Sequence, residues 1–156
     1  MPTRTSLARA LLESDFPADD ARTWTNVLAE VPLFAELSGR QRRKVASLAR
    51  IRRFADGAPL VRVGQAAAAL YVVLDGKVSV RRLGSRALTL GVGGIVGEVA
   101  LLDGGARTAT VVAQGDVVTL AIPASRFRTL LRSEPTIAIG IAEELARRLR
   151  GADAAG

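Results

Sequence analysis

Apolar residues recur at helical spacing in the first third of the chain. Before position 50 they predict helices over residues 5–14, from about 20 or 23 to 30, and over 39–50. Pro32 disfavours helix at Val31 and so separates the second helix from the third. Ser38 is a good N-cap for the third helix, because its hydroxyl can accept from a free main-chain N–H group.

After Arg50 the pattern changes to short β-rich runs separated by turn residues. The runs lie at 60–63, 70–74, 77–81, 88–90, 108–112 and 117–122. Asp75-Gly76 predicts a hairpin, Gly84-Ser85 predicts a second one, and Gly115-Asp116 predicts a further turn. About eight short strands joined by tight turns are typical of a sandwich or small barrel.

Helical spacing returns at Ala124 and predicts two closing helices. One runs to Pro135, and the last covers residues 136–150, with an apolar stripe that includes Ile137 and Ile141. We expect an α+β, mainly β fold: an eight-stranded β-roll or jelly-roll barrel with N-terminal helices and two C-terminal helices. The predicted organisation is a helical extension over 1–22, a core domain over 23–150 and a flexible tail over 151–156.

Composition narrows the chemistry of the site. The chain has no Cys and no His, which removes thiolate nucleophiles, the usual general base and the commonest metal ligands. A net charge of +7 favours anionic partners, whether nucleotides, nucleic acid or acidic lipid. The basic run over residues 40–53 is expected to be a solvated face rather than a nucleic-acid or lipid surface.

Localisation is also read from the pattern of apolar residues. No apolar run approaches the roughly 20 residues that cross a bilayer, and the first residues lack the pattern of a signal peptide. We therefore expect no membrane span and a cytoplasmic protein.

One segment, residues 95–110, does not have the pattern of an ordinary strand. Gly97 frees the backbone before a short helical turn over 98–102, and the next strand begins near Arg107. N–H groups at the start of such a turn bind anions, and a guanidinium offers a planar fork of donors suited to phosphate. Glu98 can only accept hydrogen bonds, and a ribose hydroxyl is a suitable donor.

The sequence from Gly97 to Leu102, followed by Arg107 to Val111, resembles the phosphate-binding cassette of cyclic-nucleotide-binding domains. The resemblance extends over about residues 31–150. The family includes the catabolite activator protein and the protein kinase A regulatory domains. The resemblance implies that Glu98 binds the ribose 2′-hydroxyl and Arg107 the cyclic phosphate. It further implies main-chain donors at four positions: Gly97, Val99, Ala100 and Ala109.

Two further roles follow from the same resemblance. Thr108 would contact the phosphate, or the guanine of cGMP. A residue of the last helix would cover the purine base, with Arg148 as the first candidate and Leu145 as the second. This chain has Val96 where relatives often have an aromatic residue, and Ala106 where they often have proline.

The resemblance implies a sensor or regulatory domain, not an enzyme, with no cofactor besides the ligand. We expect cAMP rather than cGMP, because the Arg- and Ala-rich composition is typical of bacteria, where cAMP is the commoner messenger of this family. Ligand binding would move the C-terminal helices and be read by a protein effector. Sequence-specific DNA binding is not expected, and a homodimer is left open. The alternative is a degenerate, ligand-free domain that serves as a protein interaction module.

Overall fold

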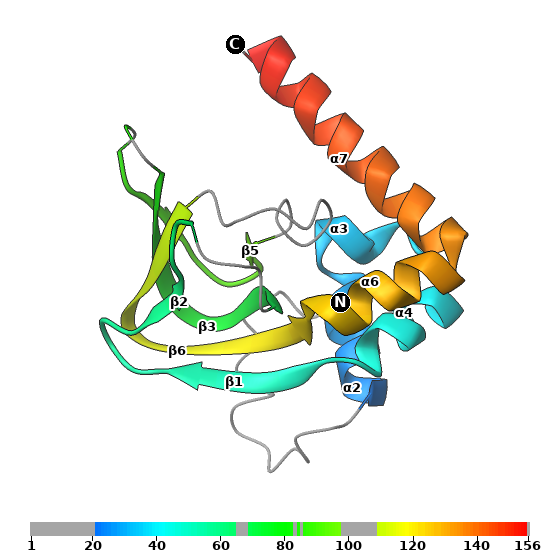
Figure 1. Ribbon diagram of the computed structural model, residues 1–156, viewed down its shortest axis with the longest axis horizontal. Coiled ribbons are helices and arrows are strands. Elements are labelled where there is room, and N and C mark those ends of the chain that lie inside the picture. Colours follow the sequence, from blue (N-terminus) through cyan, green and yellow to red (C-terminus); the bar gives the residue numbers. More distant parts are fainter. Residues whose placement is uncertain (1–20, 65–68, 83, 85, 98–108, 156) are drawn as a thin grey trace.

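A sheet and a group of helices packed against one end of it make up the part of the chain that the structure describes (Figure 1). The structure is a computed structural model and describes residues 21–64, 69–82, 84, 86–97 and 109–155. The predicted helix over 5–14 and the predicted helical turn over 98–102 therefore lie outside the described residues.

The three N-terminal helices are α2 (Ala21–Ala29), α3 (Pro32–Ala35) and α4 (Gly39–Ala46). Two of them match predicted helices, and the short third one, α3, lies where the sequence predicts only a break between helices. Ser38 caps α4 as predicted, and its hydroxyl accepts from the Gln41 amide while the Gln41 side chain accepts from the Ser38 amide. The prediction that this helix reaches residue 50 is wrong, because Arg50 already pairs in the sheet with Ala121.

Two helices close the chain, as predicted. Helix α6 (Ala124–Ser133) follows directly on the last strand, and α7 (Pro135–Ala155) begins with a proline at its first position, where no N–H group is needed. Helix α7 is longer than the predicted 136–150. In Figure 1 its second half extends away from the rest of the molecule.

The sheet is antiparallel and is built around two long strands. Its order is β1-β6-β3-β4, with β2 paired to β6 and β5 paired to β3. The strands are β1 (Arg50–Phe54), β2 (Pro59–Val61), β3 (Ala69–Arg82), β4 (Leu88–Leu90), β5 (Ile95–Val96) and β6 (Ala109–Pro123). A mainly β antiparallel fold with helices at its end is thus confirmed.

The predicted count of eight strands is not reproduced, because six strands are present in the described residues. The hairpin predicted at Asp75-Gly76 is wrong, because β3 continues through these two residues as one bent strand. The turn predicted at Gly115-Asp116 likewise lies within β6. Both glycines have positive φ angles, +88° at Gly76 and +74° at Gly115. A left-handed glycine serves a bulge as well as a turn, and here the pairing of β3 with β6 makes it a bulge.

Strand β1 was not predicted. Its sequence, Arg-Ile-Arg-Arg-Phe, shows no clean alternation, and three of its five residues are exposed. An edge strand needs fewer apolar residues than a central one, and charged side chains there discourage pairing with other chains. Tertiary pairing with β6, not local pattern, therefore sets this element.

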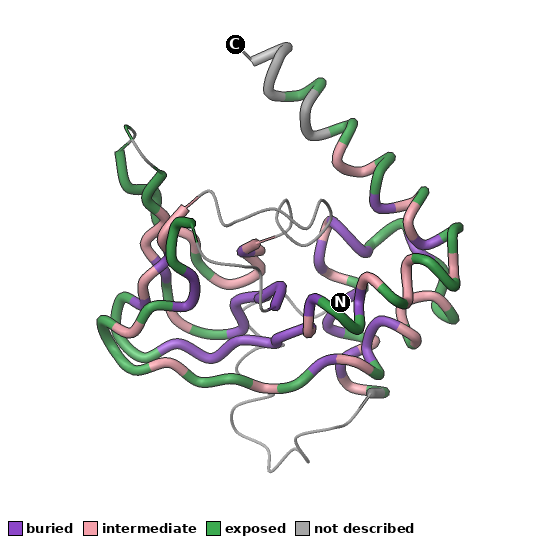
Figure 2. The backbone as a smooth tube through the Cα atoms, in the orientation of Figure 1, coloured by how far each residue is buried: buried purple, intermediate pink, exposed green. Residues whose placement is uncertain are grey.

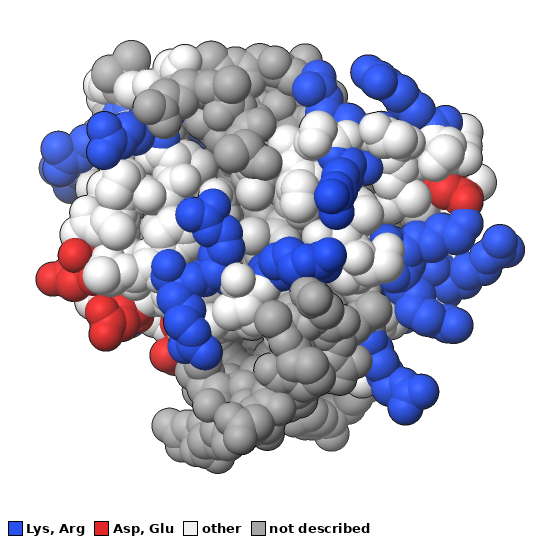
Figure 3. All heavy atoms as spheres, turned by 60° about the horizontal axis from the view of Figure 1, so that its bottom comes forward, with Lys and Arg blue, Asp and Glu red and all other residues white. Residues whose placement is uncertain are grey.

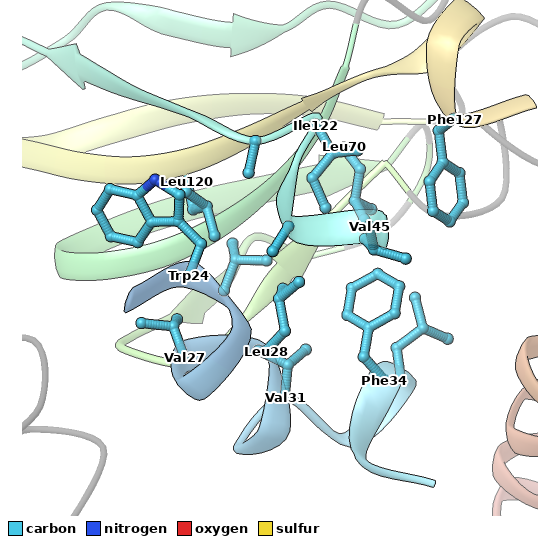
Figure 4. Close-up of a cluster of buried hydrophobic side chains, with 14 of the residues drawn as sticks. Trp24, Val27, Leu28, Val31, Phe34, Val45, Leu70, Leu120, Ile122 and Phe127 are labelled. Atoms are coloured by element: carbon cyan, nitrogen blue, oxygen red, sulfur yellow. The ribbon is translucent and has the colours of Figure 1, made fainter. Parts of the chain in front are cut away.

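Two hydrophobic clusters lie on the two faces of the long strands. The first joins the sheet to the helices and includes Leu70, Leu120 and Phe34, with Phe34 and Phe127 in edge-to-face contact at 6.2 Å (Figure 4). Alternate residues of the same strands face the inside of the roll and form the second cluster. The second cluster comprises Leu60, Val61, Ala69, Tyr71, Val73, Val78, Val96, Val111, Ala113, Val117 and Ala121. Buried residues are concentrated in the first half of β3 and the second half of β6, whereas the far end of the β3–β4 hairpin is exposed (Figure 2).

Helix α4 is tied to the junction of α6 and α7. Lys44 forms an ion pair and hydrogen bond with Glu134, the residue between the two helices. One turn earlier, Gln41 Nε2 donates to Thr136 Oγ1 over 3.0 Å. These two contacts join the N-terminal helices to the point at which the chain turns into α7.

The bend of β3 makes a first prediction. A Cβ on Gly76 would lie 2.5 Å from the Asp116 carbonyl oxygen, whereas a Cβ on Gly57, which has a similar φ of +82°, meets nothing within 4 Å. Gly57→Ala should lower the free energy of unfolding by about 1–2 kcal/mol, the cost of a left-handed alanine. Gly76→Ala should lower it further, because a bulge must open as well. Urea unfolding of both variants measures the difference. Equal losses of stability would show that the close approach of Gly76 to the Asp116 carbonyl does not constrain the two bent strands.

The ion pair makes a second prediction. The hydrogen bond from Lys44 lowers the pKa of Glu134 below its ordinary value, and the charges of Lys44 and Arg40 act in the same direction, against a smaller opposing effect of desolvation. A carboxyl group with a lowered pKa stabilises the fold above its unfolded-state pKa, and this contribution is lost as pH falls through the folded-state pKa. The stability gap between wild type and Lys44→Met should therefore narrow between pH 6 and pH 3.

Lys77→Met is the matched control, since Lys77 is exposed and makes no ion pair within the described chain. Urea unfolding at several pH values measures both gaps. A gap for Lys44→Met that stays constant down to pH 3 would show that the ion pair is not what this lysine contributes.

Candidate functional site

The predicted phosphate-binding segment is held at both ends by strands that pair with β3. Gly97 directly follows β5, whose Val96 lies opposite Tyr71. Ala109 is the first residue of β6 and lies opposite Arg82. Tyr71 and Arg82 are at opposite ends of β3, so the segment between Gly97 and Ala109 connects the two arms of the bent strand.

The inner face of the roll lies between these two anchor points and is apolar. Val73 and Val78 of β3 are fully buried in the second hydrophobic cluster, and Val111 of β6 joins them. Val80 and Leu90 are partly buried against the same cluster. A ligand held by the segment 97–109 would therefore meet an apolar wall on this side, which suits a flat ring better than a charged group.

Gly97 has a backbone that only glycine adopts readily. Its φ is +95°, and the residue is half-buried. An L-residue with a side chain is strained in this region, so glycine is required by conformation and not only by space. The predicted contribution of the Gly97 main chain to ligand binding stays a prediction.

The structure describes part of the predicted ligand-binding set. It places Gly97 and Ala109 directly, and it places the backbone of Arg148 in α7. The predicted residues that lie outside the described residues are Glu98, Val99, Ala100, Arg107 and Thr108. Their roles remain predictions.

Tyr71 is a residue of this region that is not among those predicted from the sequence. Its ring packs edge-to-face on Phe54 at 5.6 Å, and its hydroxyl accepts from Arg52 Nη1 at 3.5 Å. The guanidinium carbon of Arg52 lies 5.3 Å from the centre of the Phe54 ring. The three residues come from β1 and β3, so only the sheet register brings them together. They fix the inner face next to the strand that leads into Gly97.

Some of the basic side chains in the run over residues 40–53 make contacts within the fold. Besides Lys44 on Glu134 and Arg52 on Phe54, the Arg42 guanidinium donates to the carbonyl groups of Ala35 and Leu37 at the end of α3. The exposed members are Arg40, Arg43, Arg50, Arg52 and Arg53. Figure 3 shows basic side chains spread over this face rather than gathered in one hollow.

Two features are absent from the described residues, a membrane-spanning helix and a metal-binding cluster. No helix in this part of the chain is long and apolar enough to span a bilayer. No three His, Cys, Asp or Glu side chains within the described ranges come together as a metal site would require.

Comparison with known proteins agrees with this geometry. Residues 51–134 match the family model of the cyclic nucleotide-binding domain. The cyclic AMP receptor protein of Thermus thermophilus is 39% identical over 127 residues, which cover 78% of this chain and 59% of that protein. A cAMP-dependent protein kinase regulatory subunit of Hypocrea atroviridis is 29% identical over 147 residues, which cover 94% of this chain and 30% of the subunit.

Solved structures show the same arrangement of strands and helices. The N-terminal domain of a transcriptional regulator from Streptomyces coelicolor superposes with a TM-score of 0.66 at 32% identity, covering 80% of this chain and 90% of that one. The Thermus thermophilus catabolite activator protein gives a TM-score of 0.66 at 39% identity, over 78% of this chain and 60% of that one.

The chain spans about three fifths of the Thermus relative and about a third of the kinase subunit. The match to the family model covers more than half of the chain and includes both strands that bound the segment 97–109. The chain therefore belongs to the cyclic nucleotide-binding domain family.

Proposed function

We propose that this chain is a regulatory domain, not an enzyme, that reversibly binds a cyclic mononucleotide, with cAMP preferred over cGMP. The observation that supports this best is the anchoring of Gly97 and Ala109 at the two ends of β3, on either side of an apolar inner face. Between these anchors the sequence carries Glu98 and Arg107, the residue types that a ribose hydroxyl and a phosphate need.

The proposed chemistry divides the ligand into three parts. The cyclic phosphate carries one negative charge and is bound by the Arg107 guanidinium together with main-chain N–H groups of the segment 97–109. The ribose 2′-hydroxyl donates to Glu98. The purine lies toward the apolar inner face, near Val80 and Leu90, where loss of water favours a flat ring.

The preference for cAMP rests on the relatives. One is named a cyclic AMP receptor protein and another a cAMP-dependent protein kinase regulatory subunit. Thr108 offers a hydroxyl that the guanine of cGMP would also use. A direct comparison of the two nucleotides therefore decides the preference.

The proposed signal passes through the C-terminal helices. Helix α7 packs on α3 and α6, and a Cβ on its Gly140 would lie 2.9 Å from Leu37 Cδ2, so the helix approaches the N-terminal helices closely. Its second half, which carries Arg148, extends away from the roll (Figure 1). If Arg148 covers the base in the bound state, α7 has to move, and a protein effector would detect that movement as a population shift.

Calorimetry with cAMP and cGMP tests the binding proposal. Arg107→Ala removes a charge-assisted contact and should weaken cAMP binding about 10- to 100-fold. Glu98→Gln should weaken cAMP more than 2′-deoxy-cAMP, because the deoxy ligand has no hydroxyl for the carboxylate to accept from. Arg53→Ala removes the same charge from an exposed position on β1 and should leave the affinity unchanged.

Two results would contradict the binding proposal. Absence of heat with both nucleotides would favour the ligand-free interaction module. Equal weakening of cAMP binding by Arg53→Ala and Arg107→Ala would show that net charge, not a specific contact, governs the affinity.

Spin-label distances test the proposed movement. Because the chain has no natural cysteine, Gln114→Cys on the roll and Ala146→Cys on α7 can be labelled specifically, and both positions are exposed. Saturating cAMP should shift the distance distribution of this pair. The pair Gln114→Cys and Arg53→Cys, both on the sheet, should not change. A distribution for the first pair that is identical with and without cAMP would rule out the movement of α7.

A further inference from the structure

A hollow on the β3–β4 hairpin is not part of the segment 97–109. Its volume is about 460 Å³, within the range of small-molecule sites. Three of its lining residues are arginines, at 81, 82 and 86, and the others are Val63, Gly84, Ala87 and Thr110. The hollow is open to solvent.

The hollow lies at the free end of the β3–β4 hairpin, and the strand register shows which way its lining residues point. Val80 lies opposite Val111, and Val111 is buried in the inner cluster, so these two side chains point inward. Successive residues of a strand point to opposite faces, so Arg81 and its partner Thr110 point outward. The Val63 amide donates to Thr110 Oγ1 over 3.0 Å, which holds the chain after β2 against the same face. Arg82, the next residue, lies opposite Ala109 and alternates to the other face, so the hollow curves around the free end of the hairpin.

The charge of the hollow is not neutralised by the described residues. None of its lining residues is acidic, and its three arginines make no ion pair within the described part of the chain. Asp75 on β3 lies beyond the bend at Gly76, and the extended stretch from Lys77 to Arg81 alone is roughly 13 Å long. Asp116 on β6 likewise lies beyond the bend, on the far side of Gly115 from Thr110. This separation exceeds the screening length of about 8 Å at physiological salt, so these carboxylates do not offset the arginines.

We propose that this hollow binds a compact polyphosphate, such as the pyrophosphate group of a nucleoside diphosphate. Guanidinium groups bind phosphate oxygens in a bidentate manner, and three of them around one hollow match a group with several negative charges better than a single carboxylate. Val63 in the wall is an exposed apolar residue, at 38%, and it suits an organic part attached to the phosphates. The proposal does not rest on cyclic nucleotide binding.

Calorimetric titration of the whole chain with pyrophosphate tests the proposal. We expect saturable binding with a Kd below about 1 mM at low salt. Arg81→Ala and Arg86→Ala should each weaken it about tenfold, since each removes a charge-assisted contact. Both side chains are exposed, so the variants should fold, and thermal unfolding confirms this.

Arg53→Ala and Arg107→Ala are the controls. The first removes the same charge from β1, and the second removes the arginine of the predicted phosphate-binding cassette; neither should change pyrophosphate binding by more than about twofold. Loss of binding in Arg107→Ala would assign the pyrophosphate to the cassette and overturn the proposal. It would also be overturned if wild type shows no saturable heat, if Arg53→Ala weakens binding as much as Arg81→Ala, or if duplex DNA displaces pyrophosphate at equal phosphate concentration.

Discussion

The joint bend of β3 and β6 is the constraint on which the rest of the structure depends. The two strands pair along almost their whole length, and each contains a left-handed glycine where the pairing shifts. At this point the main chain of Gly76 lies so close to the Asp116 carbonyl that no side chain fits between them. On one side of the bend the strands carry Leu70 and Leu120 against the helices, and on the other side they carry the hairpin and the start of β6. A single backbone contact thus divides the sheet into a part that packs on the helices and a part that borders the proposed site.

This division explains how a small ligand could affect distant helices. The segment 97–109 begins beside Tyr71, on the arm that packs on the helices, and ends beside Arg82, on the arm that forms the hairpin. A ligand that contacts this segment would change the free energy of one arm relative to the other. The helical arm continues through β6 directly into α6, and α4 holds the α6–α7 junction through Lys44 and Gln41. The coupling energy available is limited to the difference in ligand affinity between the two arrangements.

Local signals in the sequence predicted those elements whose causes are local. Ser38 and the proline before α7 mark helix ends because they satisfy or remove main-chain N–H groups within a few residues. The glycines at 76 and 115 were misassigned because a left-handed backbone serves a hairpin and a bulge equally, and only pairing between distant strands decides. The same reason explains the missed strand β1 and the unpredicted contact between Arg52 and Tyr71. For the site, residue types and spacing predicted the segment 97–109, and the structure adds the positions of its two ends.

The central claim is that a cyclic nucleotide binds between the anchors of the segment 97–109. A crystal structure of the chain grown with cAMP tests it most directly. The account predicts the cyclic phosphate within hydrogen-bonding distance of the Arg107 guanidinium, the ribose 2′-hydroxyl on the Glu98 carboxylate, and the purine against the apolar inner face near Val80. A nucleotide found elsewhere on the molecule, or Glu98 and Arg107 turned away from a common hollow filled by the protein's own side chains, would contradict it.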